Sequence, residues 1–544
     1  MKYKVIGNTS GLKAAQIKSL ENLYHFTTPP DCVITEEQAR ELVKLSFETK
    51  RQIGLLIDRA GKTKYVIAGE PDRIVIPVTP EHMAVPGKLK GLRCVHTHMK
   101  EEPLTRDDLT DLALLRLDFM AAVCINKNGG PGKVYMGHIL PDENGDPYRV
   151  MEPATINDFE IDCYNLIEEL ETELSRKNAL YKTKREKEKA LLIHVATSNF
   201  KEGYASLDEL KDLCKTSRIN VIDAVVAKRK KIDSKYVLGK GKLADLTIQA
   251  IQKYATMLVF DTELTPSQIR SITDFVEMKV IDRTQLILDI FANQAKSREG
   301  KLQVELAQME YLLPRLITKN TAMSRLTGGI GGRGPGETKL EINRRRVRDK
   351  ITRLKKEIGK VRKQRHNQRA QRRKNRLPVI SIVGYTNAGK STLLNALTNS
   401  EIKAADRLFA TLDPSSRKLR FPKDSEAIIT DTVGFIQNLP SELLEAFHAT
   451  LEELEDADII LHVIDISNPR YKQQMESVDS LLKDLRLHKT PMVYVFNKID
   501  RLDMDAFDDK WLLNRGVAVS ATKRESLPPL VEKLESMIRL SKEY

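Results

Sequence analysis

The sequence contains few cysteines, and their spacing matches no paired-cysteine motif. It holds five in 544 residues, and no two are separated by the two-residue gap of a Cys-x-x-Cys motif. This absence argues against a cysteine-rich zinc module and against a disulfide framework. We therefore expect reduced thiols and a reducing compartment.

Long hydrophobic runs are also lacking. No apolar stretch approaches the roughly 20 residues that a membrane-spanning helix needs. The first residues, Met1 to Gly7, include two lysines and contain no apolar signal-peptide core. We expect a cytoplasmic protein without a membrane span.

The length and composition indicate several globular domains. A chain of 544 residues exceeds what one hydrophobic core usually supports, so three or four domains are expected. Hydrophobic residues make up 41% and charged residues 30%, which is typical of a soluble protein.

The net charge of +14 is concentrated in one segment. Residues 341–376 contain 17 Lys/Arg and 3 Asp/Glu, a net of +14, so the rest of the chain sums to zero. Such a concentrated basic patch indicates a polyanionic partner.

A phosphate-binding motif follows this basic segment. Gly384, Gly389, Lys390 and Ser391 match Gly-x4-Gly-Lys-[Ser/Thr] between the apolar run 379–383 and a helix-like run 393–397. Backbone N–H groups and a helix N-terminus in this context surround a phosphate. Lys390 would reach the β/γ oxygens, and the Ser391 hydroxyl would bind Mg²⁺.

Further motifs follow in the order that a GTPase requires. Asp431 and Gly434 end a strand and would serve the Mg²⁺ shell and the γ-phosphate, while Thr411 would coordinate Mg²⁺ only with the γ-phosphate present. Asn497 and Lys498 begin Asn-Lys-x-Asp, in which Asp500 would select guanine. The predicted nucleotide contacts are Gly384, Tyr385, Thr386, Asn387, Ala388, Gly389, Lys390, Ser391, Thr392, Phe409, Ala410, Thr411, Leu412, Asp413, Asp431, Thr432, Val433, Gly434, Asn497, Lys498, Asp500, Ser520 and Ala521.

Two positions bear on the rate of hydrolysis. Phe435 stands where Ras-like switches carry the glutamine that orients water, so intrinsic turnover should be slow. Related GTPases with Asn at the position of Asn387 bind K⁺ beside the phosphates, which makes K⁺ a candidate cofactor with Mg²⁺. Lys390, Asn387 and Gly434 are the predicted catalytic residues.

Two apolar stripes predict an antiparallel helical hairpin. Apolar residues recur at spacings of four and three over 302–316 and over 347–361. The connection contains the glycine-rich segment 327–336. A tip with little side-chain bulk suits a crevice in RNA, although a flexible linker is the alternative reading. The predicted ribosome contacts are Gly328, Gly329, Gly331, Gly332, Arg333, Gly334, Arg345 and Arg346.

The first 155 residues predict a mixed domain with strands at 53–57, 65–67 and 74–77 and a helix at 107–119. Within it, His96 and His98 precede Asp108, a set that could bind zinc. The pattern resembles the JAMM (MPN-type) metallo-isopeptidases with a spacer one residue shorter. Arg51 holds the place of that family's catalytic glutamate before Gly54, which argues against hydrolysis. An active metalloenzyme, a degenerate scaffold and purely structural histidines remain the alternatives.

Residues 188–544 resemble the HflX family of translation-associated GTPases. The resemblance rests on the segments 237–242, 260–268, 282–284, 299–306, 328–338 and 409–413. It implies binding to the large ribosomal subunit, a glycine loop reaching the peptidyl-transferase region, and GTP-dependent splitting or rescue of stalled ribosomes. It also implies that the domain before the GTPase domain could bind ATP.

We expect a multidomain α/β protein, monomeric and partly ribosome-associated. The alternatives are an RNA-processing or tRNA-modification GTPase and a GTP-regulated metallohydrolase. The expected segments are an MPN-like α+β domain (1–155), a helical connector (156–189), an HflX-type α/β domain (190–295), the hairpin (296–376) and a doubly wound GTPase domain (377–544).

Overall fold

The computed structural model describes most of the chain. The described residues are 3–543, apart from 78–87, 141–146, 159–160, 183–187, 198–199, 277, 317–338, 375–376, 399–408, 410–414, 423–424, 433, 437–453, 455, 486 and 503–514. Two compact units divide it: residues 1–200, 220–259 and 271–280 form the first, and residues 201–219, 260–270 and 281–544 form the second. Within the described ranges, every helix is too short or too polar to span a bilayer.

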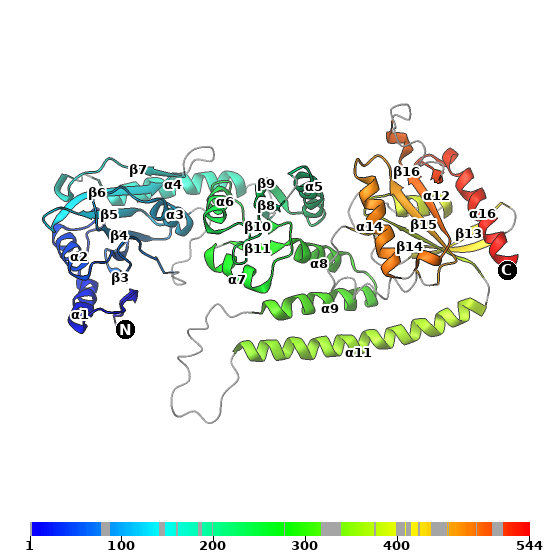
Figure 1. The fold of residues 1–544 in the computed structure, drawn as a ribbon, viewed down its shortest axis with the longest axis horizontal. Coiled ribbons are helices and arrows are strands. Elements are labelled where there is room, and N and C mark those ends of the chain that lie inside the picture. Colours follow the sequence, from blue (N-terminus) through cyan, green and yellow to red (C-terminus); the bar gives the residue numbers. More distant parts are fainter. Residues whose placement is uncertain are drawn as a thin grey trace, which may run out of the picture. The chain divides into compact units, whose positions relative to one another are not determined.

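A seven-stranded mixed sheet organises the N-terminal part, in the order β1-β3-β2-β4-β5-β6-β7 (Figure 1). Its strands are β1 (Ile6–Gly7), β2 (Ile53–Asp58), β3 (Thr63–Ala68), β4 (Leu92–His98), β5 (Met120–Ile125), β6 (Pro131–Ile139) and β7 (Tyr148–Val150). Its helices are α1 (Ala14–Asn22), α2 (Glu36–Thr49), α3 (Arg106–Leu115) and α4 (Cys163–Lys182).

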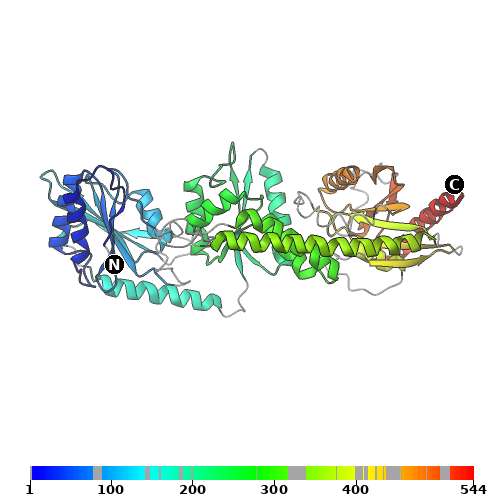
Figure 2. The same ribbon diagram turned by 90° about the horizontal axis from the view of Figure 1, so that it is seen from below.

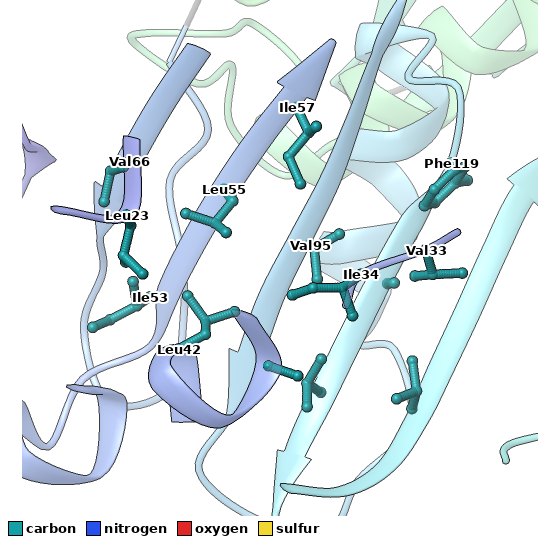
Figure 3. Close-up of a cluster of buried hydrophobic side chains, with 14 of the residues drawn as sticks. Leu23, Val33, Ile34, Leu42, Ile53, Leu55, Ile57, Val66, Val95 and Phe119 are labelled. Carbon is teal, nitrogen blue, oxygen red and sulfur yellow. The ribbon is translucent and has the colours of Figure 1, made fainter. Parts of the chain in front are cut away.

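Helix α2 covers one face of this sheet. Its apolar residue Leu42 is fully buried, and Figure 3 shows its side chain among those of Ile53, Leu55 and Val95 from β2 and β4. Because side chains alternate across a strand, the other face of β4 carries a second set of buried residues. That face holds Cys94, packed with Leu104 and Leu109 of the following loop and α3.

The strand expected at 74–77 is wrong. Residues 73–77 are described and adopt no strand. Ile74 is nevertheless buried against the second cluster, while Val75 is exposed. The apolar run that suggested a strand is therefore only partly buried, and it lacks the ladder hydrogen bonds that define a sheet.

A four-stranded sheet follows, in the order β11-β10-β8-β9. Strands β8 and β9 run parallel, as a strand–helix–strand crossover requires. The elements are β8 (Lys189–Ala196), α5 (Phe200–Thr216), β9 (Asn220–Lys228), α6 (Lys240–Gln252), β10 (Met257–Phe260), α7 (Pro266–Phe275), β11 (Lys279–Asp282) and α8 (Arg283–Gln294).

The predicted helical hairpin is present. Helices α9 (Arg298–Arg315) and α11 (Lys339–Lys374) pack side by side, and Figure 2 shows α11 as one uninterrupted yellow-green helix. Arg298 faces Glu357 at one end, and Arg344 donates to the Leu316 carbonyl at the other, so the pair is antiparallel. Leu306, Leu354 and Ile358 form its buried seam.

The C-terminal part is a six-stranded sheet in the order β13-β14-β12-β15-β16-β17. All neighbours are parallel except the β13–β14 pair. The elements are β12 (Val379–Gly384), α12 (Lys390–Thr398), β13 (Ser415–Arg420), β14 (Glu426–Asp431), β15 (Ile459–Asp465), α14 (Tyr471–Asp484), β16 (Met492–Asn497), β17 (Gly516–Ala518) and α16 (Pro528–Glu543). The expectation of a multidomain α/β protein with a C-terminal doubly wound domain is confirmed.

Candidate active site

The glycine-rich loop leaves β12 at the carboxyl edge of the six-stranded sheet. Strand β12 lies between β14 and β15, so the loop sits where the strand order reverses, the usual ligand position in such sheets. Two glycines permit its course. A Cβ on Gly384 would lie 2.2 Å from the Val463 carbonyl oxygen, and one on Gly389, whose φ is +93°, would lie 2.3 Å from Asn497 Nδ2. Any larger residue would push the loop away from its neighbours.

Lys390 starts helix α12 and is buried under the loop. Its Nζ donates to the carbonyl oxygens of Gly384 (3.1 Å) and Tyr385 (2.9 Å). Burial lowers the pKa of the ammonium to about 8, while Asp431 opposes that shift. A buried ammonium of this kind is poised to bind an anionic group, which offsets the cost of its lost hydration.

Two of the three residues predicted to serve Mg²⁺, Ser391 and Asp431, lie next to each other, while Thr411 is outside the described residues. Ser391 Oγ donates to Asp431 Oδ2 at 2.7 Å. Asp431 Oδ1 is buried and has no hydrogen-bond partner within the described residues. A hydroxyl and a carboxylate with a spare oxygen are hard ligands of the type Mg²⁺ prefers, so these residues fit the ion.

Gly434 follows Asp431 and lies against the loop. A Cβ there would come within 2.9 Å of Thr386 Cγ2 and 3.0 Å of Lys390 Nζ, so only glycine leaves this space open. The next residue, Phe435, donates its N–H to the Gly384 carbonyl (3.1 Å) and accepts from Thr386 N (2.7 Å). Its side chain is buried and offers no hydrogen-bonding group to orient a water molecule.

The predicted base-binding residues form one connected group. Asn497, 1% exposed, donates from Nδ2 to the Ala388 carbonyl (2.8 Å), and its Oδ1 accepts from Ala521 N (3.0 Å). Ser520 Oγ donates to Asp500 Oδ1 at 2.6 Å, which lowers the pKa of that carboxyl. Asp500 is therefore ionised near neutral pH and able to accept the N–H groups of guanine.

Lys498 also bridges two parts of the site. Its Nζ donates to the Asn387 carbonyl at 2.8 Å and pairs with Asp465 at 2.6 Å. Sequence reasoning missed Asp465. Its position at the carboxyl end of β15, next to β16, could have suggested it, because adjacent parallel strands end at the same edge.

A second missed residue contacts the loop from α5. Glu209 accepts a hydrogen bond from the Tyr385 hydroxyl (2.5 Å) and pairs with Arg283 (2.8 Å), which also pairs with Asp261 (3.0 Å). All of these side chains are buried. No local pattern marks Glu209, since it is distant from the loop in sequence.

Several predicted residues can be placed only partly. Ala410 to Asp413, Val433 and the glycine-rich tip with Arg333 lie outside the described residues. Phe409 is buried and packs against Phe291 of α8, with ring centroids 4.5 Å apart and ring planes inclined by 54°. Thr432 donates to the Ile382 carbonyl, so its hydroxyl is used within the sheet. Arg345 and Arg346 are exposed on α11, as a contact with RNA requires.

The structure also gathers the histidine pair of the N-terminal part. His96, His98 and Asp108 are buried, and their ligand atoms lie within 4.8 Å of one another. Arg51, in contrast, donates to the carbonyl oxygens of Asn8 and Ser10.

Family comparisons decide the class of this site. Models described as the GTP-binding GTPase N-terminal region, the GTP-binding GTPase middle region and a 50S ribosome-binding GTPase match residues 204–292, 294–372 and 379–498. A protein named GTPase HflX from Caldanaerobacter subterraneus is 46% identical over 351 residues, which cover 64% of this chain and 81% of the relative. The chain belongs to the HflX family of GTPases.

Two further relatives with the same name agree. The protein from Lacrimispora saccharolytica is 46% identical over 67% of this chain and 86% of its own length. The Escherichia coli protein is 42% identical over 58% of this chain and 74% of its own length. The resemblance predicted from the motifs is thus confirmed, and the C-terminal domain is a GTP-binding P-loop domain that hydrolyses GTP.

Proposed function

We propose that this chain binds the large ribosomal subunit in its GTP form, splits or rescues stalled ribosomes, and is reset by hydrolysis. The observation that carries the proposal is the basic surface of α11. This helix of 36 residues is about 54 Å long at the usual rise per residue. It directly precedes β12, so a change in the nucleotide site has a short covalent route to it.

The cations of α11 divide into two groups. Some are paired across or along the hairpin: Lys350 with Glu305 (2.6 Å) and Lys355 with Glu310 (2.8 Å). A second group is exposed and forms no ion pair with any described residue. This group consists of Arg346, Arg348, Lys356, Lys360 and Lys363. Cations that form no ion pair within the described part of the chain can bind RNA phosphates and release counterions.

The nucleotide site would act through the glycine-rich loop and the segments that follow β14 and β16. Lys390 binds the β/γ phosphates, Gly434 leaves room for the γ-phosphate, and Asp500 selects guanine with Asn497 and Lys498 holding the loops around the base. Ser391 and Asp431 would hold Mg²⁺, which neutralises phosphate charge when bound. Thr411 would close on the same ion in the GTP form.

Slow intrinsic turnover follows from Phe435, whose side chain cannot hydrogen-bond to water. The exposed Asn387, with a left-handed φ of 62°, is the residue through which K⁺ would act beside the phosphates. Faster turnover in K⁺ than in Na⁺, abolished by Asn387→Ala, is the expected result. Equal rates in the two salts would refute the K⁺ role.

Sedimentation with purified ribosomal subunits tests the main proposal. The chain should pellet with the large subunit in a non-hydrolysable GTP analogue and much less in GDP. A triple variant, Arg346→Glu, Lys356→Glu and Lys360→Glu, should reduce the salt dependence of binding by about three units of log K per log salt. A control variant with the same charge change at exposed Lys18, Lys127 and Lys533 should bind like the parent.

Binding that is independent of nucleotide, or equal for both subunits, would contradict this function. It would favour the RNA-processing alternative instead. Equal loss of binding in the two triple variants would show that net charge matters and that α11 does not.

A further inference from the structure

Strand β4 and the first turn of α3 bring three potential metal ligands together. His96 and His98 alternate with Thr97 along β4, so both imidazoles project from the same face of the sheet. The chain then turns, and Thr105 caps α3, which places Asp108 in the first helical turn and back against the end of β4. All three ligand side chains are almost completely buried: His96 and His98 at 0% and Asp108 at 7% exposure.

The separations between these atoms match a tetrahedral ion. His96 Nε2 lies 3.0 Å from His98 Nε2, and the Asp108 oxygens lie 3.4 Å from His96 Nε2 and 3.3 Å from His98 Nε2. Zinc bonds of about 2.0–2.1 Å at tetrahedral angles place neighbouring ligand atoms about 3.3 Å apart. We propose that His96, His98 and Asp108 hold one divalent ion of the zinc class.

The surrounding hydrogen bonds orient two of the three groups for this role. His98 Nδ1 lies 3.1 Å from the Glu102 carbonyl oxygen, which can only accept, so the proton is on Nδ1 and the Nε2 lone pair faces the group. Thr105 donates from both N and Oγ1 to Asp108 Oδ2, each at 2.7 Å. Such outer contacts typically fix the orientation of ligands in metal sites.

An ion-free hydrogen-bonded cluster is the competing explanation. In that case one proton would be shared between the two Nε2 atoms, or a protonated imidazole would face Asp108. His96 Nδ1 is buried and has no hydrogen-bond partner within the described residues under either explanation, so the two differ only at the Nε2 atoms and at Asp108. Three buried polar groups with converging lone pairs are better compensated by a cation than by each other.

The described ligand group supplies no general base of its own. Asp108 is its one carboxylate and is placed, like the two histidines, as a ligand of the ion. Arg51 is hydrogen-bonded to the 8–10 loop and brings no carboxylate to the group. The ion would instead join β4 to α3 and stabilise this domain, with a fourth position left for a non-protein ligand.

Metal analysis of the full-length chain tests the proposal. After removal of metal with a chelator and reloading, we expect about one zinc per chain, in keeping with a single three-ligand group. Loading with Co²⁺ should give the visible absorption of tetrahedral coordination. The temperature of the unfolding transition should fall when EDTA is added to the zinc-loaded protein.

Two near-isosteric variants and one control make the test specific. His96→Gln and Asp108→Asn should lose the stoichiometric zinc, the cobalt spectrum and the response to EDTA. His138→Gln alters a buried histidine of β6 that is outside the group, and should keep all three. Thr105→Val should weaken zinc binding by about 10–100-fold, because it removes the hydroxyl that orients Asp108.

The opposite results would overturn the site. These are a parent chain that retains no stoichiometric zinc, or an Asp108→Asn variant that binds zinc as tightly as the parent. The thermal unfolding of each metal-free variant, compared with that of the metal-free parent, is the check that the N-terminal domain is folded, because GTP binding reports only on the other compact unit.

Discussion

Replacing Asn497 by alanine should weaken GDP binding strongly. The side chain is 1% exposed and joins two loops, through Nδ2 to the Ala388 carbonyl (2.8 Å) and through Oδ1 to Ala521 N (3.0 Å). Alanine leaves both backbone groups without their partner in a buried position. Each such group costs about 1–3 kcal/mol, so we expect a total of about 2–4 kcal/mol after local relaxation. Because about 1.4 kcal/mol is a factor of ten, the GDP dissociation constant should rise about 30- to 1000-fold.

Titration with a fluorescent GDP analogue measures this effect. Asn468→Ala is the matched control, because Asn468 Oδ1 only accepts from the nearby Arg470 N at 2.9 Å in a surface turn. That variant should bind GDP within about threefold of the parent. Circular dichroism establishes that both variants are folded. A folded Asn497→Ala variant with the affinity of the control would refute the claim that this side chain holds the two loops around the nucleotide.

Three further predictions concern single ionisable groups. Burial lowers the pKa of Lys390 to about 8, and a phosphate binds the charged form of this side chain, so GDP affinity should fall about tenfold per pH unit above pH 8. Lys390→Arg should abolish this decline. A flat pH profile in the parent would contradict the prediction. Asp500→Asn should shift the preference from guanine to xanthine nucleotides, since the amide N–H of asparagine can donate to the keto oxygen that xanthine has in place of the guanine amino group. A retained preference for guanine in a competition assay would exclude Asp500 as the residue that selects the base. Arg283→Met leaves the buried carboxylates of Glu209 and Asp261 without their cation. The free energy of unfolding, measured by denaturant titration, should therefore fall by about 3–5 kcal/mol. A loss below about 1 kcal/mol would show that these ion pairs contribute little to stability.

The nucleotide motifs were predictable because their chemistry depends on local spacing. Gly384, Gly389, Lys390 and Ser391 lie on one short loop, whose course is dictated by two glycines and the helix that follows. The hairpin was predictable for a similar reason. A regular apolar spacing determines which face of each helix is buried, and a connection between two such helices favours an antiparallel pair.

Contacts between distant segments were not predictable in the same way. Asp465 pairs with Lys498 because β15 and β16 are neighbours, and Glu209 meets Tyr385 across a separation of 176 residues. The irregular segment at 73–77 is a related failure. Its run of β-branched residues resembles a strand, but whether a partner strand is available depends on the whole sheet.

The sequence by itself determined the GTPase class, the family, the order of the phosphate and guanine motifs, and the position of the basic helix. These properties follow from residue identity and short-range spacing, which persist in any conformation of the chain. The tertiary structure decided that Asn497 links the two loops of the nucleotide site. It also decided that His96 and His98 meet Asp108 with separations suited to one ion. Those distances depend on how strands and helices pack, and only the folded chain brings these side chains together.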